Sequence, residues 1–148
     1  MNFNTILTKF GQDIGVGPVA LDERDSCYLR FDQHTLALEH IAAQGSLFIY
    51  TSFTDMVASC PQLTFEQLLT CNHFGQGSGN GWFSYNPETQ ETFLMTKLNT
   101  NCLDYDVFVL HIEGFLHSIE RAKSFLQGLN KTASGPLHHK MHVKNPFA

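Results

Sequence analysis

The N-terminal segment has apolar residues at the spacing of an amphipathic helix. They recur every three or four positions, at Phe3, Ile6, Leu7, Phe10 and Ile14. A helix places residues with this spacing on one face. Asn2 is a residue type that caps helix N-termini, and the glycines and proline of residues 15–18 interrupt the pattern. The pattern predicts a helix over residues 3–14 with one face toward the core.

Three short strands are predicted to follow, because apolar and polar residues alternate there. The first covers residues 27–31, and the second surrounds Leu36 and Leu38. A tight turn at Gln44 and Gly45 precedes the third strand.

The third strand, Leu47-Phe48-Ile49-Tyr50, is apolar on both faces. Phe48 and Tyr50 point opposite to Leu47 and Ile49, because successive side chains of a strand alternate. One pair therefore lies away from the layer on which the other pair packs. The second cover comes either from the chain's own helices or from a partner chain, and the sequence leaves both open.

The second half of the chain predicts a helix, a hairpin and a long helix. Thr64 and Gln67 have the spacing of a capping box at the start of a helix over residues 65–73. Two strands, over residues 82–85 and 92–98, are joined by a turn at residues 86–89. Asp104 caps a final helix whose apolar residues step by four and three. They are Phe108, Ile112, Phe115, Ile119, Ala122, Leu126 and Leu129.

The order helix-strand-strand-strand-helix-strand-strand-helix predicts an α+β fold, with helices packed on a mainly antiparallel sheet. The length of 148 residues fits one domain. We assign residues 1–129 to that domain. Residues 130–148 lose the helical periodicity and are assigned to a C-terminal tail.

Composition favours a binding protein over a nucleic-acid or membrane protein. The chain has thirteen Phe, and only 16% of its residues are charged, against roughly 25% in an average domain. This composition fits either an apolar surface left for a partner or a core rich in Phe. A net charge of -5 with nine Lys and Arg argues against binding nucleic acid. No apolar run is long enough to cross a bilayer, and the N-terminus lacks the pattern of a secretory signal. We expect a cytosolic protein without membrane insertion.

Glycines at alternate positions from 75 to 81 resemble a phosphate-binding loop. Such a loop needs a strand before it and a helix after it, and here the order is reversed. The favoured interpretation is a flexible connector between helix and hairpin.

Other candidate chemistry is weak. His138, His139 and His142 cluster in the tail, but they lack the fixed surroundings of a structural metal site. The four cysteines show no Cys-x-x-Cys spacing, so reduced thiols are expected. No motif of an activated nucleophile is present. The sequence therefore predicts no catalytic residue, metal or cofactor.

Four segments together resemble the type III secretion class I chaperone family, the CesT-like Tir chaperones. They are Leu7–Gly11 with Ile14–Gly15; Pro18–Asp22 with Cys27–Asp32; Leu68–Gly75 leading to Gly79 and Gly81; and Asn86–Thr89 followed by Leu98, Leu103 and Asp104. The resemblance implies a bacterial cytosolic homodimer without enzymatic activity. It implies that the protein holds the extended N-terminal segment of one or more secreted effectors, with the secretion ATPase as a further candidate partner. The alternative is a small α+β ligand-binding or hydrolytic protein of similar layout.

Two sets of residues are predicted to make these contacts. The effector-binding set combines the first helix with the faces of the first three strands: Phe3, Leu7, Phe31, Leu38, Phe48 and Tyr50. The dimer set follows the second helix and the next strand: Leu68, Leu69, Phe74 and Trp82.

Overall fold

A computed structural model describes residues 1–132 and contains all eight predicted elements. In chain order these are α1 (Phe3–Asp13), β1 (Ser26–Phe31), β2 (His34–Ile41), β3 (Ser46–Ser52), α3 (Phe65–Asn72), β4 (Trp82–Asn86), β5 (Glu91–Asn99) and α4 (Tyr105–Thr132). A five-residue helix, α2 (Thr54–Ala58), follows β3 and was not predicted. Single 3-10 turns cover Ala42–Gln44 and His73–Gly75.

The five strands form one sheet in the order β1-β2-β3-β5-β4, and each neighbouring pair is antiparallel. This confirms the predicted α+β class. The register aligns one residue from each strand in a row across the sheet. The row is Tyr28, Ala37, Tyr50, Met95 and Trp82.

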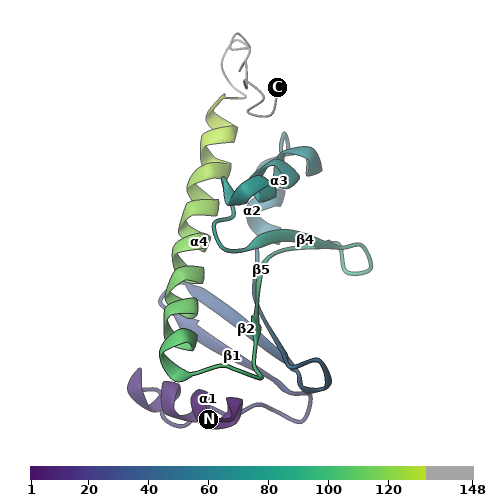
Figure 1. The fold of residues 1–148 in the computed structure, drawn as a ribbon. Coiled ribbons are helices and arrows are strands. Elements are labelled where there is room, and N and C mark those ends of the chain that lie inside the picture. The colour runs from purple at the N-terminus through teal and green to yellow at the C-terminus, as the bar shows by residue number, and fades with distance from the viewer. Residues whose placement is uncertain (133–148) are drawn as a thin grey trace, which may run out of the picture.

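The core lies between one face of the sheet and the helices. In Figure 1, α4 runs along the sheet and α1 lies across its lower end. Leu47 and Ile49 are fully buried on this face. Phe108 of α4 meets Phe10 of α1 edge to face, with ring centroids 5.2 Å apart. Side chains of α1, α3 and α4 belong to this single cluster, and Met56 and Val57 of α2 pack against it, so all four helices cover the same face.

The predicted helix caps are confirmed. Thr64 and Gln67 form both bonds of the capping box. Asp104 Oδ1 accepts a hydrogen bond from the Val107 amide at 2.9 Å. The last helix continues to Thr132, past its predicted end. Residues 133–148, with the histidine cluster, lie outside the described residues, and their assignment to a tail stays a prediction.

The glycine-rich segment is closely packed, so its interpretation as a flexible connector was wrong. Gly77 and Ser78 are buried. A Cβ at Gly77 would lie 2.9 Å from the Phe125 ring, and one at Gly79 would lie 2.5 Å from Ser118 Oγ. Here glycine permits close approach to α4, a role that depends on tertiary contacts.

Candidate functional site

The other face of the sheet is not covered by any helix of the described chain. Its apolar side chains, including Phe48, Tyr50 and Phe93, do not belong to the core cluster. Phe48, Tyr50 and Phe93 are half-buried. This face and its aromatic side chains will be called the open sheet face. Its aromatic members are Tyr28, Phe48, Tyr50, Trp82 and Phe93, with Ala37 and Met95 between them.

Tyr50 lies at the centre of the open sheet face. Its ring meets Phe93 edge to face at 5.5 Å, and its hydroxyl donates to Glu39 Oε2 at 3.4 Å. Burial, helped by the negative charge of Glu39, raises the pKa of Tyr50, so the hydroxyl stays neutral. A shallow hollow of about 340 Å³ beside Tyr50 is also lined by Tyr28 and Phe93. The surface combines aromatic contact area with a few polar atoms.

Strand β1 forms one edge of the sheet, and part of its main chain is unpaired. The main-chain groups of Ser26 point away from β2 and bond Asp22. The Ser26 N–H donates to Asp22 Oδ1, and the Ser26 carbonyl accepts from the Asp22 N–H. Alternation along an antiparallel pair directs the N–H and C=O groups of Tyr28 and Arg30 to the same side. Within residues 1–132 no strand lies there. The Tyr28 side chain is 71% exposed beside this edge. The open sheet face therefore adjoins main-chain groups that are free to pair.

The predicted effector-binding residues do not lie on one surface. Phe48 and Tyr50 are on the open sheet face, opposite to Leu47 and Ile49, as alternation predicted. The structure places three others in the core, where their side chains are at most 5% exposed: Phe3, Leu7 and Leu38. The core uses Phe3, Ile6, Leu7 and Phe10 of the predicted stripe, whereas Ile14 follows the end of α1 and is exposed. Leu38 lies on the same face of the sheet as Ile49, its partner in register.

Phe31 is half-buried on the helix side of the sheet, where its ring lies 6.3 Å from Phe10. It lines a hollow of about 400 Å³ that contains a small polar network. There His34 Nε2 lies 2.7 Å from Glu120 Oε1, and Lys123 Nζ lies 3.3 Å from His34 Nδ1. The residues lining this hollow include no Ser, Thr or Cys, so the hollow offers no hydroxyl or thiol nucleophile beside the histidine.

Tyr28 and Phe93 belong to the open sheet face but were missed from the sequence. Tyr28 alternates with Cys27 and Leu29, and Phe93 alternates with Thr92 and Leu94. The alternation was visible. What the sequence lacked was the register that aligns these strands with Tyr50.

Strand β4 forms the opposite edge, and α3 lies against it. The Asn72 side chain accepts from the Phe83 amide at 2.6 Å and donates to the Phe83 carbonyl at 3.2 Å. These two bonds occupy the main chain at the centre of the edge. A side-chain amide has both a donor and an acceptor, so one residue type satisfies both groups.

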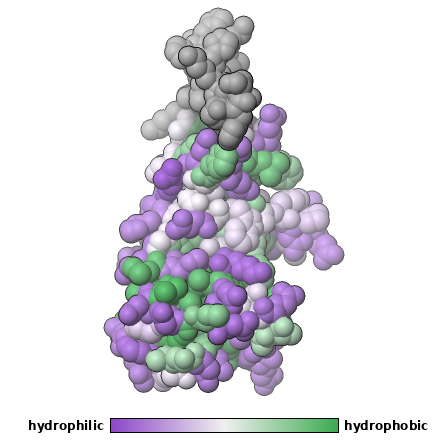
Figure 2. All heavy atoms as spheres, viewed as in Figure 1, coloured by the Kyte–Doolittle hydropathy of each residue, from purple (hydrophilic) through white to green (hydrophobic). Residues whose placement is uncertain are grey.

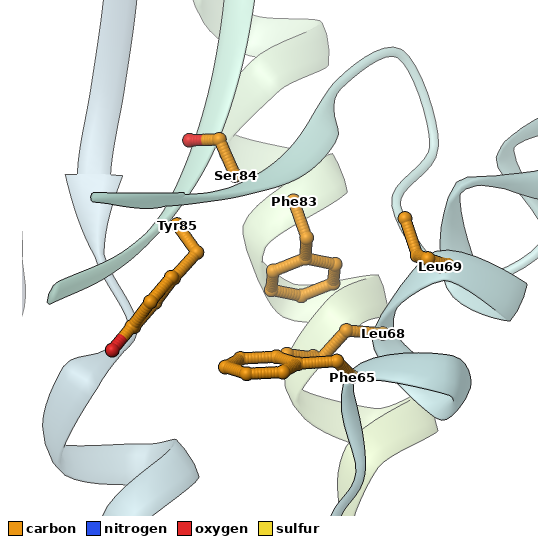
Figure 3. Close-up of a pocket in the computed structure, with 6 residues that line it drawn as sticks. All are labelled: Phe65, Leu68, Leu69, Phe83, Ser84 and Tyr85. Carbon is orange, nitrogen blue, oxygen red and sulfur yellow. The ribbon is translucent and has the colours of Figure 1, made fainter. Parts of the chain in front are cut away.

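An apolar pocket lies between α3 and β4 (Figure 3). It has a volume of about 240 Å³ and is lined by Phe65, Leu68, Leu69, Phe83, Ser84 and Tyr85. The rings of Phe65 and Tyr85 lie next to each other, with centroids 4.9 Å apart. This pocket will be called the α3–β4 pocket. Its rim is unusually apolar for surface, because Phe65, Leu69 and Tyr85 are all exposed.

The predicted dimer residues divide between three places. Leu69 and Phe74 are 67% and 87% exposed at the α3 surface. Leu68 is buried in the core, since it faces the sheet rather than solvent. Trp82 is half-buried on the open sheet face, on the side of β4 opposite to Phe83.

A further group of exposed apolar residues lies near the end of α1 and the start of α4. Figure 2 shows apolar side chains gathered at the lower end of the molecule among polar ones. Ile14, Val16, Val107 and Leu110 are the exposed apolar residues of these segments. Among the described helices none is both long and apolar enough to cross a membrane. Within residues 1–132 no three His, Cys, Asp or Glu side chains are grouped as metal ligands.

Solved structures share this fold. A chain of the ExsC–ExsE complex is 20% identical, with a TM-score of 0.68, and the match covers 83% of this chain and 96% of that chain. A chain of the HopA1–SchA chaperone–effector complex is 14% identical, with a TM-score of 0.59 and coverage of 87% and 93%. The structure of the Yersinia pestis type III secretion chaperone SycH with a stable fragment of YscM2 gives 17% identity, a TM-score of 0.54 and coverage of 89% and 97%.

A search of curated proteins found no match. A family model, in contrast, matches most of the described chain. It is that of the Tir chaperone protein (CesT) family, and the match covers residues 5–123, from α1 into α4. This confirms the resemblance seen in the sequence: the chain belongs to the Tir chaperone protein (CesT) family.

Proposed function

We propose that this protein is a type III secretion chaperone that binds the N-terminal segment of one or more effectors. Bound in this way, the effectors stay soluble and competent for secretion. The observation that carries the proposal is the open sheet face beside the unpaired edge of β1. A chain that buried all its apolar surface would not have an exposed aromatic face next to unpaired main-chain groups. The HopA1–SchA structure, described as a chaperone–effector complex, supports this assignment.

The open sheet face suits an extended client segment. A strand laid along β1 would bond the free main-chain groups of Tyr28 and Arg30 whatever its sequence. Every second side chain of that strand would then project on the side of the sheet that carries the open sheet face, next to Tyr28. Tyr50 and Phe48 lie on β3, two strands further into the sheet, and would present large apolar areas to the part of the client that continues across this face. Main-chain pairing would supply general affinity, and the aromatic face would select apolar side chains.

The wider assignment follows from family membership together with the sequence. We infer a bacterial cytoplasmic homodimer that has no enzymatic activity and needs no metal or cofactor. The predicted dimer contact includes Leu69 and Phe74 at the α3 surface. The secretion ATPase is a further candidate partner. The alternative, a hydrolytic protein, would have to draw on the polar network around His34, but no hydroxyl or thiol side chain lines that hollow.

The test begins with the client. Purification from the native host, followed by mass spectrometry, identifies the bound effector, and its N-terminal segment is then made separately. We expect Tyr50→Lys and Phe48→Lys to weaken binding of that segment at least tenfold by calorimetry. Circular dichroism should be unchanged, because neither residue belongs to the core cluster.

The matched control is Leu110→Lys, which adds the same charge at an exposed apolar residue of α4. This control should bind normally. Folded Tyr50 and Phe48 variants that bind as well as the control would place the client elsewhere and reject this surface.

A further inference from the structure

The hollow beside Tyr50 on the open sheet face combines aromatic rings with carboxylates. It has a volume of about 340 Å³, and the rings that line it are those of Tyr28, Tyr50 and Phe93. Glu91 also lines it, and Glu39 accepts a hydrogen bond from the Tyr50 hydroxyl at 3.4 Å. Strand alternation and register place all five side chains on the same face of the sheet. This hollow, with Glu39 beside it, will be called the aromatic hollow.

The two carboxylates of the aromatic hollow have no cationic partner within residues 1–132. Neither Glu39 nor Glu91 belongs to the ion pairs of this part of the chain. The residues that line the hollow include no Lys, Arg or His. Burial is the main cause of the raised pKa of Tyr50, and the negative charges of Glu39 and Glu91 add to it. Both charges therefore act on the hollow, and neither is compensated there.

The cations of the same face are engaged elsewhere. A positive charge is attracted to the face of an aromatic ring when it lies within about 6 Å of the ring centroid. Lys97 makes this contact with Phe48, and its Nζ lies 5.3 Å from the ring centroid. Arg30 follows Tyr28 by two residues, but its Nε donates to the Asp32 carbonyl at 3.4 Å. The rings of the aromatic hollow are left without such a cation, although carboxylates lie beside them.

We infer that the aromatic hollow binds a lysine or arginine side chain of the client. The rings attract the positive charge, the two carboxylates compensate it, and the apolar stem of the side chain covers Ala37, the small residue between Tyr28 and Tyr50. An aliphatic side chain would partly desolvate the carboxylates without giving them a partner. The α3–β4 pocket has no charged residue in its lining and offers no such compensation. The inference rests on the proposed function and specifies one client position that is not apolar.

Glu91→Gln tests the charge of the aromatic hollow. Glutamine has nearly the same shape as glutamate but no charge, so binding of the effector segment should weaken about fivefold by calorimetry. The matched control is Glu88→Gln, in the exposed turn between β4 and β5, which changes the net charge by the same amount. This control should bind like the unchanged chain. Neither glutamate belongs to the core cluster, so both melting temperatures should stay the same.

Variants of the effector segment identify the side chain that enters the hollow. Each Lys and Arg of the segment is replaced in turn by Gln and measured against the unchanged chain and against Glu91→Gln. One replacement should weaken binding to the unchanged chain about fivefold and have little further effect with Glu91→Gln, because both changes remove the same contact. Phe93→Leu should show the same coupling, since leucine keeps an apolar side chain but has no ring.

The outcomes distinguish this inference from the proposed function. Effects that add for every Lys and Arg of the segment, or a Glu91→Gln chain that binds like its control, would overturn the cation in the hollow. A segment without Lys or Arg would do the same. If Tyr50→Lys and Phe48→Lys still bind poorly in those cases, the client uses the open sheet face without a cation. If these two variants bind as well as their own control, the surface is rejected, and this inference with it.

Discussion

The hydroxyl group of Ser118 holds the glycine-rich segment against α4. Its Oγ donates to the Gly114 carbonyl and accepts from the Asn80 amide, each at 3.0 Å. Gly79 lies directly against it with a φ of 59°. Residue 79 therefore meets two separate demands, a left-handed backbone and no side chain.

These two demands can be separated by substitution. Gly79→Ala should lower the free energy of unfolding by about 3 kcal/mol, from about 1 kcal/mol of backbone strain and about 2 kcal/mol of overpacking. Gly75→Ala has a similar φ of 67° but open space around it, so it should lose only about 1 kcal/mol. Urea unfolding followed by circular dichroism measures both. Equal losses would mean that Ser118 moves away without cost.

His111 links α4 to β5 and makes stability depend on pH. Its Nε2 lies 3.0 Å from Thr96 Oγ1. The Thr96 hydroxyl donates a hydrogen bond to the Asn80 carbonyl at 3.2 Å. Desolvation lowers the pKa of His111 below its ordinary value of about 6.5. The unfolded chain therefore binds this proton more readily than the folded chain.

The resulting stability is fully present above about pH 6.5 and is lost as the pH falls toward the lowered pKa of the folded state. Urea unfolding at pH 7.5 and 5.5 should show a larger difference for the unchanged chain than for His111→Gln. Glutamine keeps a donor for Thr96 but does not titrate. The comparison between the two proteins cancels the effect of the other histidines. The same pH dependence in both would assign it to groups other than His111.

At the scale of elements, Asn72 determines how α3 meets β4. Asn72→Ala would leave the amide and carbonyl of Phe83 without their partners, and this should cost about 2 kcal/mol. Thr70→Ala, an exposed position on the same helix, is the control and should cost well under that. The measurement is again urea unfolding. A loss no larger than that of the control would show that water replaces the amide without penalty.

Periodicity predicted the long helices and strands. It missed a short helix and a close packing contact. The stripe of Phe108, Ile112 and Phe115 repeats enough times to define α4. The helix Thr54–Ala58 has five residues, fewer than two turns, so no repeat can develop. The close packing of Gly79 depends on Ser118, far along the chain, and local sequence carries no sign of it.

The candidate site was predictable only in part, for a similar reason. Alternation separated Phe48 and Tyr50 from Leu47 and Ile49. It did not reveal that the core takes up Leu38 and, from α1, both Phe3 and Leu7, because that depends on which face the helices cover. Tyr28 and Phe93 can be assigned to the open sheet face only when the register between the strands is known.

At the scale of the whole molecule, the two edges of the sheet differ. Asn72 occupies the centre of the β4 edge through Phe83, and α3 lies beside it. The β1 edge has unpaired main-chain groups at Tyr28 and Arg30 next to the open sheet face. An extended client is therefore expected to add to β1 rather than to β4, and a dimer through α3 would leave β1 free. The two proposed interactions occupy different ends of one sheet.

Arg30→Pro tests the pairing at β1. Proline removes one main-chain N–H, and edge strands tolerate it where that N–H does not face a neighbouring strand. The Arg30 amide points away from β2, so the ladder with β2 should survive and the circular dichroism spectrum should not change. Binding of the effector segment should weaken about tenfold, since one hydrogen bond is worth about 1 kcal/mol net and the proline ring also obstructs the incoming strand.

Two controls accompany this change. Arg30→Ala removes the same side chain but keeps the N–H group, so any loss of charge contacts appears in both variants. Leu29→Pro removes an N–H that faces β2, because Leu29 pairs with Leu36 on the bonded side of the ladder, and this variant should lose several kcal/mol of stability. If Arg30→Pro stays folded and binds the segment as tightly as Arg30→Ala, the client does not pair with β1. The aromatic side chains of the open sheet face would then have to account for binding without help from the main chain.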